Sequence, residues 1–184
     1  MLYIDYVEMV IFITIGWLAA RASIAKKYKR IYLKREVELL LVYICFVVIA
    51  RFTFFPFTKV DGRIQPLILD VSKVYPFRIN LEPIVHMNDY VDKRKAVINF
   101  WGNVAMFIPI GIVYPSVFKG LNTHVKVIAA GIGLSLAIEI IQLPFYQRVT
   151  DIDDLIMNSA GYLIGYGIYL VVKCVRNFIK KSKK

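Results

Sequence analysis

The sequence is poor in cysteine, histidine and charge. It has two cysteines, Cys45 and Cys174, two histidines and 20% charged residues in a chain of 184, whereas soluble domains have about 25% charged residues. Each cysteine falls within or at the end of an apolar run, so both are interpreted as packing residues and no disulfide is predicted. No familiar nucleophile–base pair or metal motif occurs, so the composition assigns no catalytic residue.

Acidic residues are also scarce. There are 13 Asp and Glu against 24 Lys and Arg, which gives a net charge of +11. A nucleic-acid-binding protein gathers its basic residues on one face, but here they fall between apolar runs, so no nucleic-acid partner is expected. The first apolar run follows Asp5 and Glu8 and lacks a basic start and a small-residue cleavage site. It is therefore predicted to be a retained span and not a signal peptide.

Long apolar runs dominate the chain. Hydrophobic residues make up 58% of it, and the mean hydropathy is +0.58. A helix needs roughly 20 apolar residues to cross a hydrocarbon core about 30 Å thick. Five runs approach or meet that length, near residues 6–22, 37–55, 98–118, 125–145 and 155–175. The sequence therefore predicts a single membrane domain over residues 1–184, an all-α polytopic membrane helix bundle.

The Lys and Arg residues predict the orientation. Fifteen of the 24 fall between the first and second runs, between the third and fourth, or after the fifth. Eight fall on the opposite side, and Arg51 lies inside the second run. Because positive charge is retained on the cytoplasmic side, the N-terminus is predicted outside and the C-terminus in the cytoplasm.

The segment from 56 to 97 is predicted to face outward. It is too polar to span, yet its stretch VYPFRINLEPIVHM is rich in aliphatic and aromatic residues. Non-helical backbone enters a membrane only where protein or a wet cavity satisfies its hydrogen bonds. The segment is interpreted as a half-inserted or interfacial loop, and a surface loop packed on the helix ends is the alternative.

Polar and small residues recur at helical spacing in the last three runs. They are Asn99 and Asn103 in the third, Gly131, Ser135, Glu139 and Gln142 in the fourth, and Asp154, Asn158, Gly161 and Gly165 in the fifth. Residues three or four apart share a helix face, and small residues let helices approach closely. We expect the stripes to meet at a pocket that opens outward, with Glu139 two turns below the surface. A charge near mid-bilayer costs roughly 2.5 to 3.5 kcal/mol, so Glu139 needs a partner or a polar cavity.

These positions also have purely structural explanations. Thr150 or Asp151 suits the N-cap of the fifth span, and acids in its first turn favour the helix dipole. Asn99 and Asn103 would hold two helices together. Arg51 could reach the membrane surface or enter the pocket, and its spacing does not decide between the two. His86 is most simply a loop residue.

Four stretches, in this order, resemble one known family. They are NLEPI (Asn80–Ile84), NFWGNVAMFIPIGIVYP (Asn99–Pro115), SLAIEIIQ (Ser135–Gln142) and RVTDIDDLIMNSAGYLIGY (Arg148–Tyr166). The chain resembles the VanZ-like family from about residue 51 onward. The resemblance implies a multi-pass protein of the bacterial cell membrane. The founding member of that family is associated with resistance to teicoplanin-type glycopeptides, which carry a lipid tail.

The resemblance implies no catalytic roles, but its motifs extend the set of candidate pocket residues. Together with the helical stripes, they give Arg51, Asn80, Asn99, Asn103, Glu139, Gln142, Arg148, Asp151, Asp153, Asp154 and Asn158.

Three functions fit such a pocket. In the first, it binds the head group of a membrane lipid, a lipid-linked cell-wall precursor or a lipoglycopeptide antibiotic, without a cofactor. In the second, carboxylates including Glu139 hold Mg²⁺ or Ca²⁺. The protein is then a lipid-phosphate hydrolase or head-group transferase, with Arg51 and Arg148 as phosphate clamps and His86 or Glu139 as base. In the third, the chain steadies another envelope protein.

Overall fold

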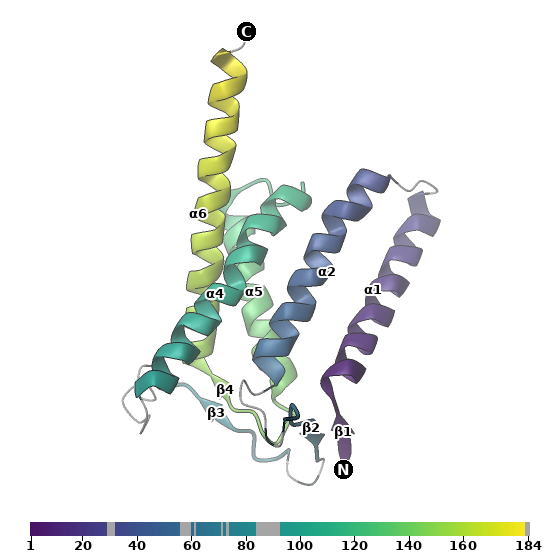
Figure 1. The fold of residues 1–184 in the computed structure, drawn as a ribbon, viewed down its shortest axis with the longest axis vertical. Helices are drawn as coiled ribbons and strands as arrows, with labels where there is room; N and C mark the ends of the chain where they lie inside the picture. Colours follow the sequence, from purple (N-terminus) through teal and green to yellow (C-terminus); the bar gives the residue numbers. More distant parts are fainter. Residues whose placement is uncertain are drawn as a thin grey trace. The chain divides into compact units, whose positions relative to one another are not determined.

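Long helices make up most of the described chain, as Figure 1 shows. The structure is a computed structural model that describes residues 1–28, 32–55, 60, 62–70, 72, 74–83 and 93–182. The helices are α1 (Tyr6–Tyr28), α2 (Leu33–Phe54), α4 (Lys93–Val117), α5 (His124–Gln142) and α6 (Ile152–Ser182). Within that part of the chain, five helices are long and apolar enough to cross a membrane by length and composition. The predicted all-α, multi-pass fold is confirmed.

The helix boundaries differ from the predicted runs at several ends, and α1 and α2 are each longer than predicted. α5 ends at Gln142 because Pro144 follows and disfavours helical backbone in the residue before it. Glu139 therefore lies in the last turn of α5 and not two turns inside it. α4 begins at Lys93, so the end of the predicted outward loop 56–97 is helical. α6 continues to Ser182, well past the predicted end at residue 175.

Two short strand pairs join segments that are far apart in the sequence. β1 (Leu2–Ile4) pairs antiparallel with β2 (Leu67–Leu69), and β3 (Ile79–Asn80) pairs parallel with β4 (Thr150–Asp151). The first pair joins the N-terminus to the segment after α2, and the second joins that segment to the turn after α5. All three lie where α1 begins and α2 ends, which is the end of these two helices that the charge distribution predicts to be outside (Figure 1).

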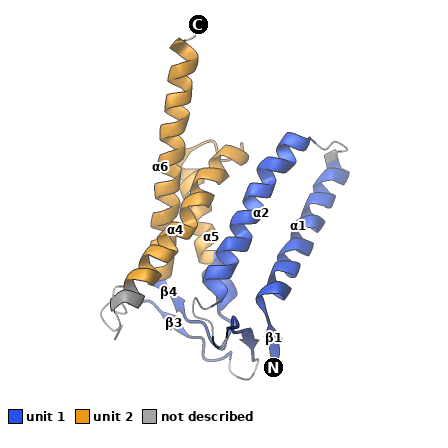
Figure 2. Cartoon of the chain, in the orientation of Figure 1, with its two compact units in different colours: residues 1–82, 137–152 blue, residues 83–136, 153–184 orange. Residues whose placement is uncertain are grey.

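The chain folds as two compact units, coloured separately in Figure 2. Unit 1 contains residues 1–82 and 137–152, and unit 2 contains residues 83–136 and 153–184. The chain passes from unit 2 to unit 1 within α5, and returns at the start of α6.

In unit 1, α1 packs along α2. The hydroxyl oxygens of Thr14 and Tyr43 lie 2.7 Å apart, and the ring of Trp17 packs against that of Tyr43. Towards the other end of the pair, Arg21 forms a salt bridge with Glu36. These contacts hold α1 along α2, and the rings of Tyr6 and Phe55 continue the contact to the end of α2 near the strands.

In unit 2, glycines bring the backbones of α4 and α6 together. A Cβ atom on Gly161 would lie 2.0 Å from the carbonyl oxygen of Val104, and one on Gly165 would lie 2.1 Å from that of Ile108. No larger residue fits at either position without moving backbone. The predicted close approach of helices through small residues is confirmed here.

Candidate functional site

Side chains from α5 and from the turn after it cap the C-terminal end of α2. The last carbonyl groups of a helix have no partner within the helix. Gln142 Nε2 donates to the Thr53 carbonyl oxygen at 2.6 Å, and Arg148 Nε donates to that of Phe54 at 2.9 Å. An arginine at this position also interacts favourably with the helix dipole. Both side chains therefore hold the turn after α5 against the end of α2.

Arg51 lies near the same end of α2. Its Nη1 donates to the Phe55 carbonyl oxygen at 3.3 Å, and its guanidinium lies over the rings of Tyr6 and Phe52. The side chain is half-buried. Arg51 therefore joins the start of α1 to the end of α2.

Glu139 is buried in unit 1, with an exposed fraction of 2%. Its Oε2 accepts a hydrogen bond from the Asp151 backbone nitrogen at 3.0 Å, and its carbonyl oxygen accepts one from the Thr150 hydroxyl at 2.9 Å. Asp151 immediately precedes α6, where the positive end of a helix dipole favours a carboxylate. The carboxyl group is thus held among protein groups.

Asn80 is connected to Glu139 through Asp151. Asn80 Nδ2 donates to Asp151 Oδ1 at 3.1 Å, and the two residues are partners in the β3–β4 pair. Glu139, Asp151 and Asn80 therefore form one hydrogen-bonded chain that comes from three separate stretches of the sequence.

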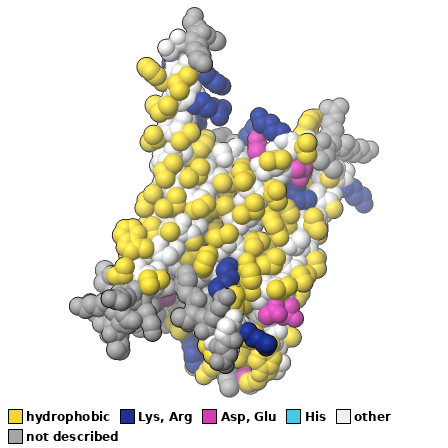
Figure 3. All heavy atoms as spheres, in the orientation of Figure 1, with side chains coloured by type: hydrophobic (Ala, Val, Ile, Leu, Met, Phe, Trp, Pro, Cys, Tyr) yellow, Lys and Arg dark blue, Asp and Glu magenta, His cyan; other side chains and the backbone are white. Residues whose placement is uncertain are grey.

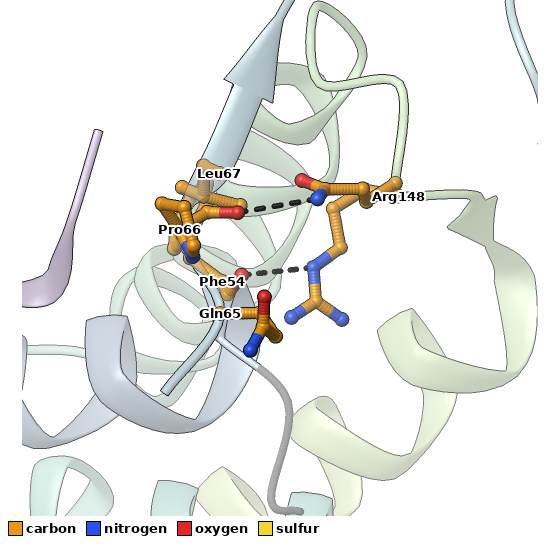
Figure 4. Close-up of a pocket in the computed structure, with 6 residues that line it drawn as sticks. Phe54, Gln65, Pro66, Leu67 and Arg148 are labelled. Atoms are coloured by element: carbon orange, nitrogen blue, oxygen red, sulfur yellow. Dashed lines mark hydrogen bonds between the residues drawn. The ribbon is translucent and has the colours of Figure 1, made fainter. Parts of the chain in front are cut away.

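A cavity of about 150 Å³ lies beside Arg148 in unit 1 (Figure 4). Its walls are formed by Phe54, Gln65, Pro66, Leu67, Gln147 and Arg148. Gln147 braces one wall, because its Oε1 accepts from the Ile68 nitrogen at 2.8 Å and its Nε2 donates to the Pro66 oxygen at 3.2 Å. Figure 4 shows the Arg148 guanidinium extending towards the Gln65 side chain. One cation and two amides thus share the cavity with apolar side chains.

A second group of candidate residues lies in unit 2. Asn103, with an exposed fraction of 5%, donates through Nδ2 to Asp154 Oδ1. Asp153 and Asp154 lie in the first turn of α6, where the helix dipole favours them. Asn99 lies one turn before Asn103 on α4 and is half-buried. The polar stripes of α4 and α6 therefore meet at the Asn103–Asp154 bond.

Unit 2 also contains buried polar groups without a partner. Among the described residues, the Ser135 hydroxyl, the Asn158 Oδ1 and the Tyr162 hydroxyl accept and donate no hydrogen bond. All three residues are at most 1% exposed. An unsatisfied buried polar group costs about 1 to 3 kcal/mol. Asn158 is therefore buried, but it makes no side-chain contact with another candidate residue through this oxygen.

The described residues contain no group of side chains that would support the metal hypothesis. Across the described ranges, no three His, Cys, Asp or Glu side chains are placed to hold one ion. His86, the suggested base, lies outside the described residues. Mg²⁺ or Ca²⁺ binding therefore stays a prediction of the enzyme hypothesis.

Sequence reasoning missed most of the residues around the cavity. Gln147 directly precedes Arg148, and this adjacency was the one available signal for it. Gln65 belongs to a segment with no regular periodicity. Its neighbours meet the turn after α5 through the Leu69–Phe145 bridge and the hydrogen bonds of Gln147 to Pro66 and Ile68.

Comparison with known proteins assigns the chain to a family. The sequence model of the family described as VanZ/LLP1 matches residues 39–173. The chain belongs to the VanZ/LLP1 family. Protein VanZ of Enterococcus faecium is 33% identical over 107 residues, which are 58% of this chain and 62% of that protein. The match thus covers less than two thirds of that relative's length. No solved structure matches the chain significantly.

The VanZ/LLP1 region contains both groups of candidate residues and the cavity. It begins within α2 and ends within α6, at residue 173. α1 and the last turns of α6 lie outside it, so family membership by itself says nothing about their role.

Proposed function

We propose that this VanZ/LLP1 protein binds the anionic head group of a lipid at the outer face of a bacterial cell membrane. The ligand is a lipid-linked cell-wall precursor or a lipid-tailed glycopeptide. The observation that carries the proposal is the cavity beside Arg148, where a cation and two amide side chains share one small space.

The side chains around the cavity favour an anion. A guanidinium is a planar fork that matches the oxygens of phosphates and carboxylates. The bond from Arg148 Nε to the Phe54 oxygen fixes the direction of that fork. Gln65 and Gln147 add amide groups, which can donate to phosphate or sugar oxygens. A phosphate, a pyrophosphate or a carboxylate is therefore the group that fits.

The size of the cavity limits what can enter. At about 150 Å³ it is smaller than the roughly 300 to 1,000 Å³ of pockets that enclose drug-sized ligands. It takes one charged group, and the acyl or prenyl chain stays in the bilayer. The segment that pairs with β4 exposes Tyr75, Phe77 and Leu81, which gives unit 1 an apolar surface on its outer side.

The chain of bonds through Glu139 positions this site. Glu139 holds the nitrogen of Asp151, three residues after Arg148, and Gln142 holds α2 through Thr53. A fixed turn lowers the conformational entropy that binding must remove. Glu139 thus acts on the ligand through Arg148.

Head-group binding offers a route to antibiotic resistance. A protein that occupies or remodels the target of a glycopeptide at the membrane surface protects the cell wall. The resemblance to a founding member associated with teicoplanin resistance favours the lipid-tailed glycopeptides. Expression in a susceptible Gram-positive host should then raise the inhibitory concentration of teicoplanin more than that of a glycopeptide without a lipid tail.

Equilibrium binding tests the proposal. The purified protein in nanodiscs is titrated with a fluorescent lipid that carries a pyrophosphate head group, and with a neutral-headed lipid of the same chain. We expect only the first to bind. Gln65→Leu should weaken binding about tenfold or more, since a hydrogen bond to a charged group contributes roughly 1.5 to 3 kcal/mol. Arg63→Gln removes an exposed cation outside the cavity and should leave binding unchanged.

Two other outcomes would reject the proposal. Hydrolysis or transfer of the head group during the titration would favour the enzyme. Equal affinity for both lipids, unchanged by Gln65→Leu, would favour the third hypothesis, in which the chain steadies another envelope protein.

A further inference from the structure

The last part of α6 extends beyond the length that a membrane span needs. α6 runs from Ile152 to Ser182, 31 residues. At 1.5 Å per residue, the part up to Leu170 is about 28 Å long, close to the roughly 30 Å of the hydrocarbon core. Every residue from Val171 to Ser182 is exposed, and Figure 2 shows this part of unit 2 continuing past the ends of α4 and α5. We call residues 171–182 the α6 extension.

The α6 extension has one apolar side. Its large hydrophobic residues are Val171, Val172, Val175, Phe178 and Ile179. Their spacing of one, four, seven and eight residues from the first places them on one helix face. Phe178 is 74% exposed and Val171 is 64% exposed, so no other part of the described chain covers this face.

The remaining face of the α6 extension is basic. It carries Lys173, Arg176, Lys180 and Lys181, and no acidic residue occurs between 171 and 182. Figure 3 shows hydrophobic side chains along one side of this end of α6 and Lys and Arg side chains along the other. A helix with one apolar and one basic face fits the boundary between the acyl chains and the head groups of a membrane.

We propose that the α6 extension binds anionic phospholipids of the leaflet predicted to be cytoplasmic. Its apolar side enters the head-group boundary, and its four cations lie among lipid phosphates. The partner is lipid because the surface combines exposed hydrophobic area with positive charge only, and a basic cluster that follows a span is attracted to anionic lipid at close range.

The helix can reach the membrane surface by bending just before the extension. Gly167 lies in the last turn of the span, one turn before the extension, and a Cβ atom there would meet nothing within 4 Å. Helices kink most readily at glycine and proline. Tyr166 is the last buried residue of α6, and beyond it only Tyr169 and Leu170 are half-buried, so packing restrains the helix little after Gly167.

A label at Cys174 tests the proposal in the full chain. Cys174 is exposed within the α6 extension, whereas Cys45 is buried and is removed as Cys45→Ala. A spin label at Cys174 reports its accessibility to oxygen, which concentrates in lipid, and to a water-soluble nickel chelate. The protein is compared in nanodiscs of phosphatidylcholine alone and of phosphatidylcholine with phosphatidylglycerol.

We expect phosphatidylglycerol to move the label from the nickel-accessible to the oxygen-accessible environment. Each Lys or Arg changed to Gln in the extension should lower the ratio of membrane-bound to unbound extension about fivefold. The variant with all four cations changed to Gln should lose the shift. Lys26→Gln with Lys27→Gln neutralises two exposed cations at the end of α1 and should keep it. High salt should weaken the shift.

Two results would overturn the proposal. One is a label equally accessible to nickel in both lipid compositions. The other is dipolar broadening between labels in both compositions, which would show that a second copy of the chain covers the apolar side.

Discussion

The ring of Tyr162 fills the space that a side chain on Gly131 would need. A Cβ atom on Gly131 would lie 2.2 Å from Tyr162 Cδ1, and Tyr162 is 1% exposed, so its ring has little room to move. This contact fixes the distance between α5 and α6 within unit 2.

Gly131→Ala is therefore predicted to destabilise the protein by about 1 to 3 kcal/mol, the range for overpacking a close-packed site. Thermal unfolding in detergent measures the change. Gly133→Ala is the control, because nothing lies within 4 Å of a Cβ atom at Gly133. Alanine also has the higher helix propensity, so this variant should be neutral or slightly stabilising. Equal melting temperatures for the two variants would show that the α5–α6 contact is not close.

The bond between Asn103 and Asp154 is predicted to be an energetic link between α4 and α6. A hydrogen bond to a charged group contributes about 1.5 to 3 kcal/mol. A double-mutant cycle with Asn103→Ala and Asp154→Ala should give a coupling energy in this range. A coupling near zero would mean that each residue acts through other partners.

Glu139 is predicted to stabilise the start of α6 through an oxygen atom. Glu139→Gln keeps an acceptor for the Asp151 nitrogen, so the protein should fold with nearly unchanged stability. Glu139→Ala leaves that buried donor unsatisfied and should cost about 1 to 3 kcal/mol. Chemical unfolding of both variants separates the cases. An equal loss for Gln and for Ala would show that the fold requires the negative charge and not only an acceptor oxygen.

Ser135→Ala tests a buried hydroxyl that has no partner among the described residues. Ser135 is 0% exposed, and replacing an unsatisfied polar group with an apolar one of similar size is close to neutral or stabilising. We expect an equal or higher melting temperature. A fall would show that a water molecule or another group satisfies the hydroxyl in the folded protein.

The membrane helices could be predicted from the sequence because the bilayer core offers the backbone no water to hydrogen-bond. A long apolar run must satisfy its hydrogen bonds internally, so its length and composition determine its structure. The close contacts of Gly161 and Gly165 could be predicted from their spacing, because small residues four apart on one helix face let a second helix approach closely. The burial of Glu139 was expected because a charge within a span needs protein around it.

The cavity could not be predicted because it depends on loop segments. Gln65 and Gln147 come together because Leu69 pairs with Phe145 and the Gln147 side chain bonds the backbone of Ile68. These partners lie about 80 positions apart, and neither segment has a periodic pattern that predicts the contact. The fourth apolar run extends to residue 145 in the sequence, so it did not predict that α5 ends at Gln142, whose side chain reaches the Thr53 carbonyl oxygen. Pairing between such short strands depends on the tertiary contacts around them, which the local sequence does not reveal.

The central claim is that an anionic head group enters the cavity beside Arg148. Photo-crosslinking tests it most directly, with a pyrophosphate-headed lipid that carries a diazirine next to the head group, followed by mass spectrometry of the labelled peptides. The account predicts adducts on the residues that line the cavity, such as Gln65, Pro66 and Gln147, and their loss when excess unlabelled lipid competes. Adducts confined to other segments, or unchanged by the competitor, would contradict it.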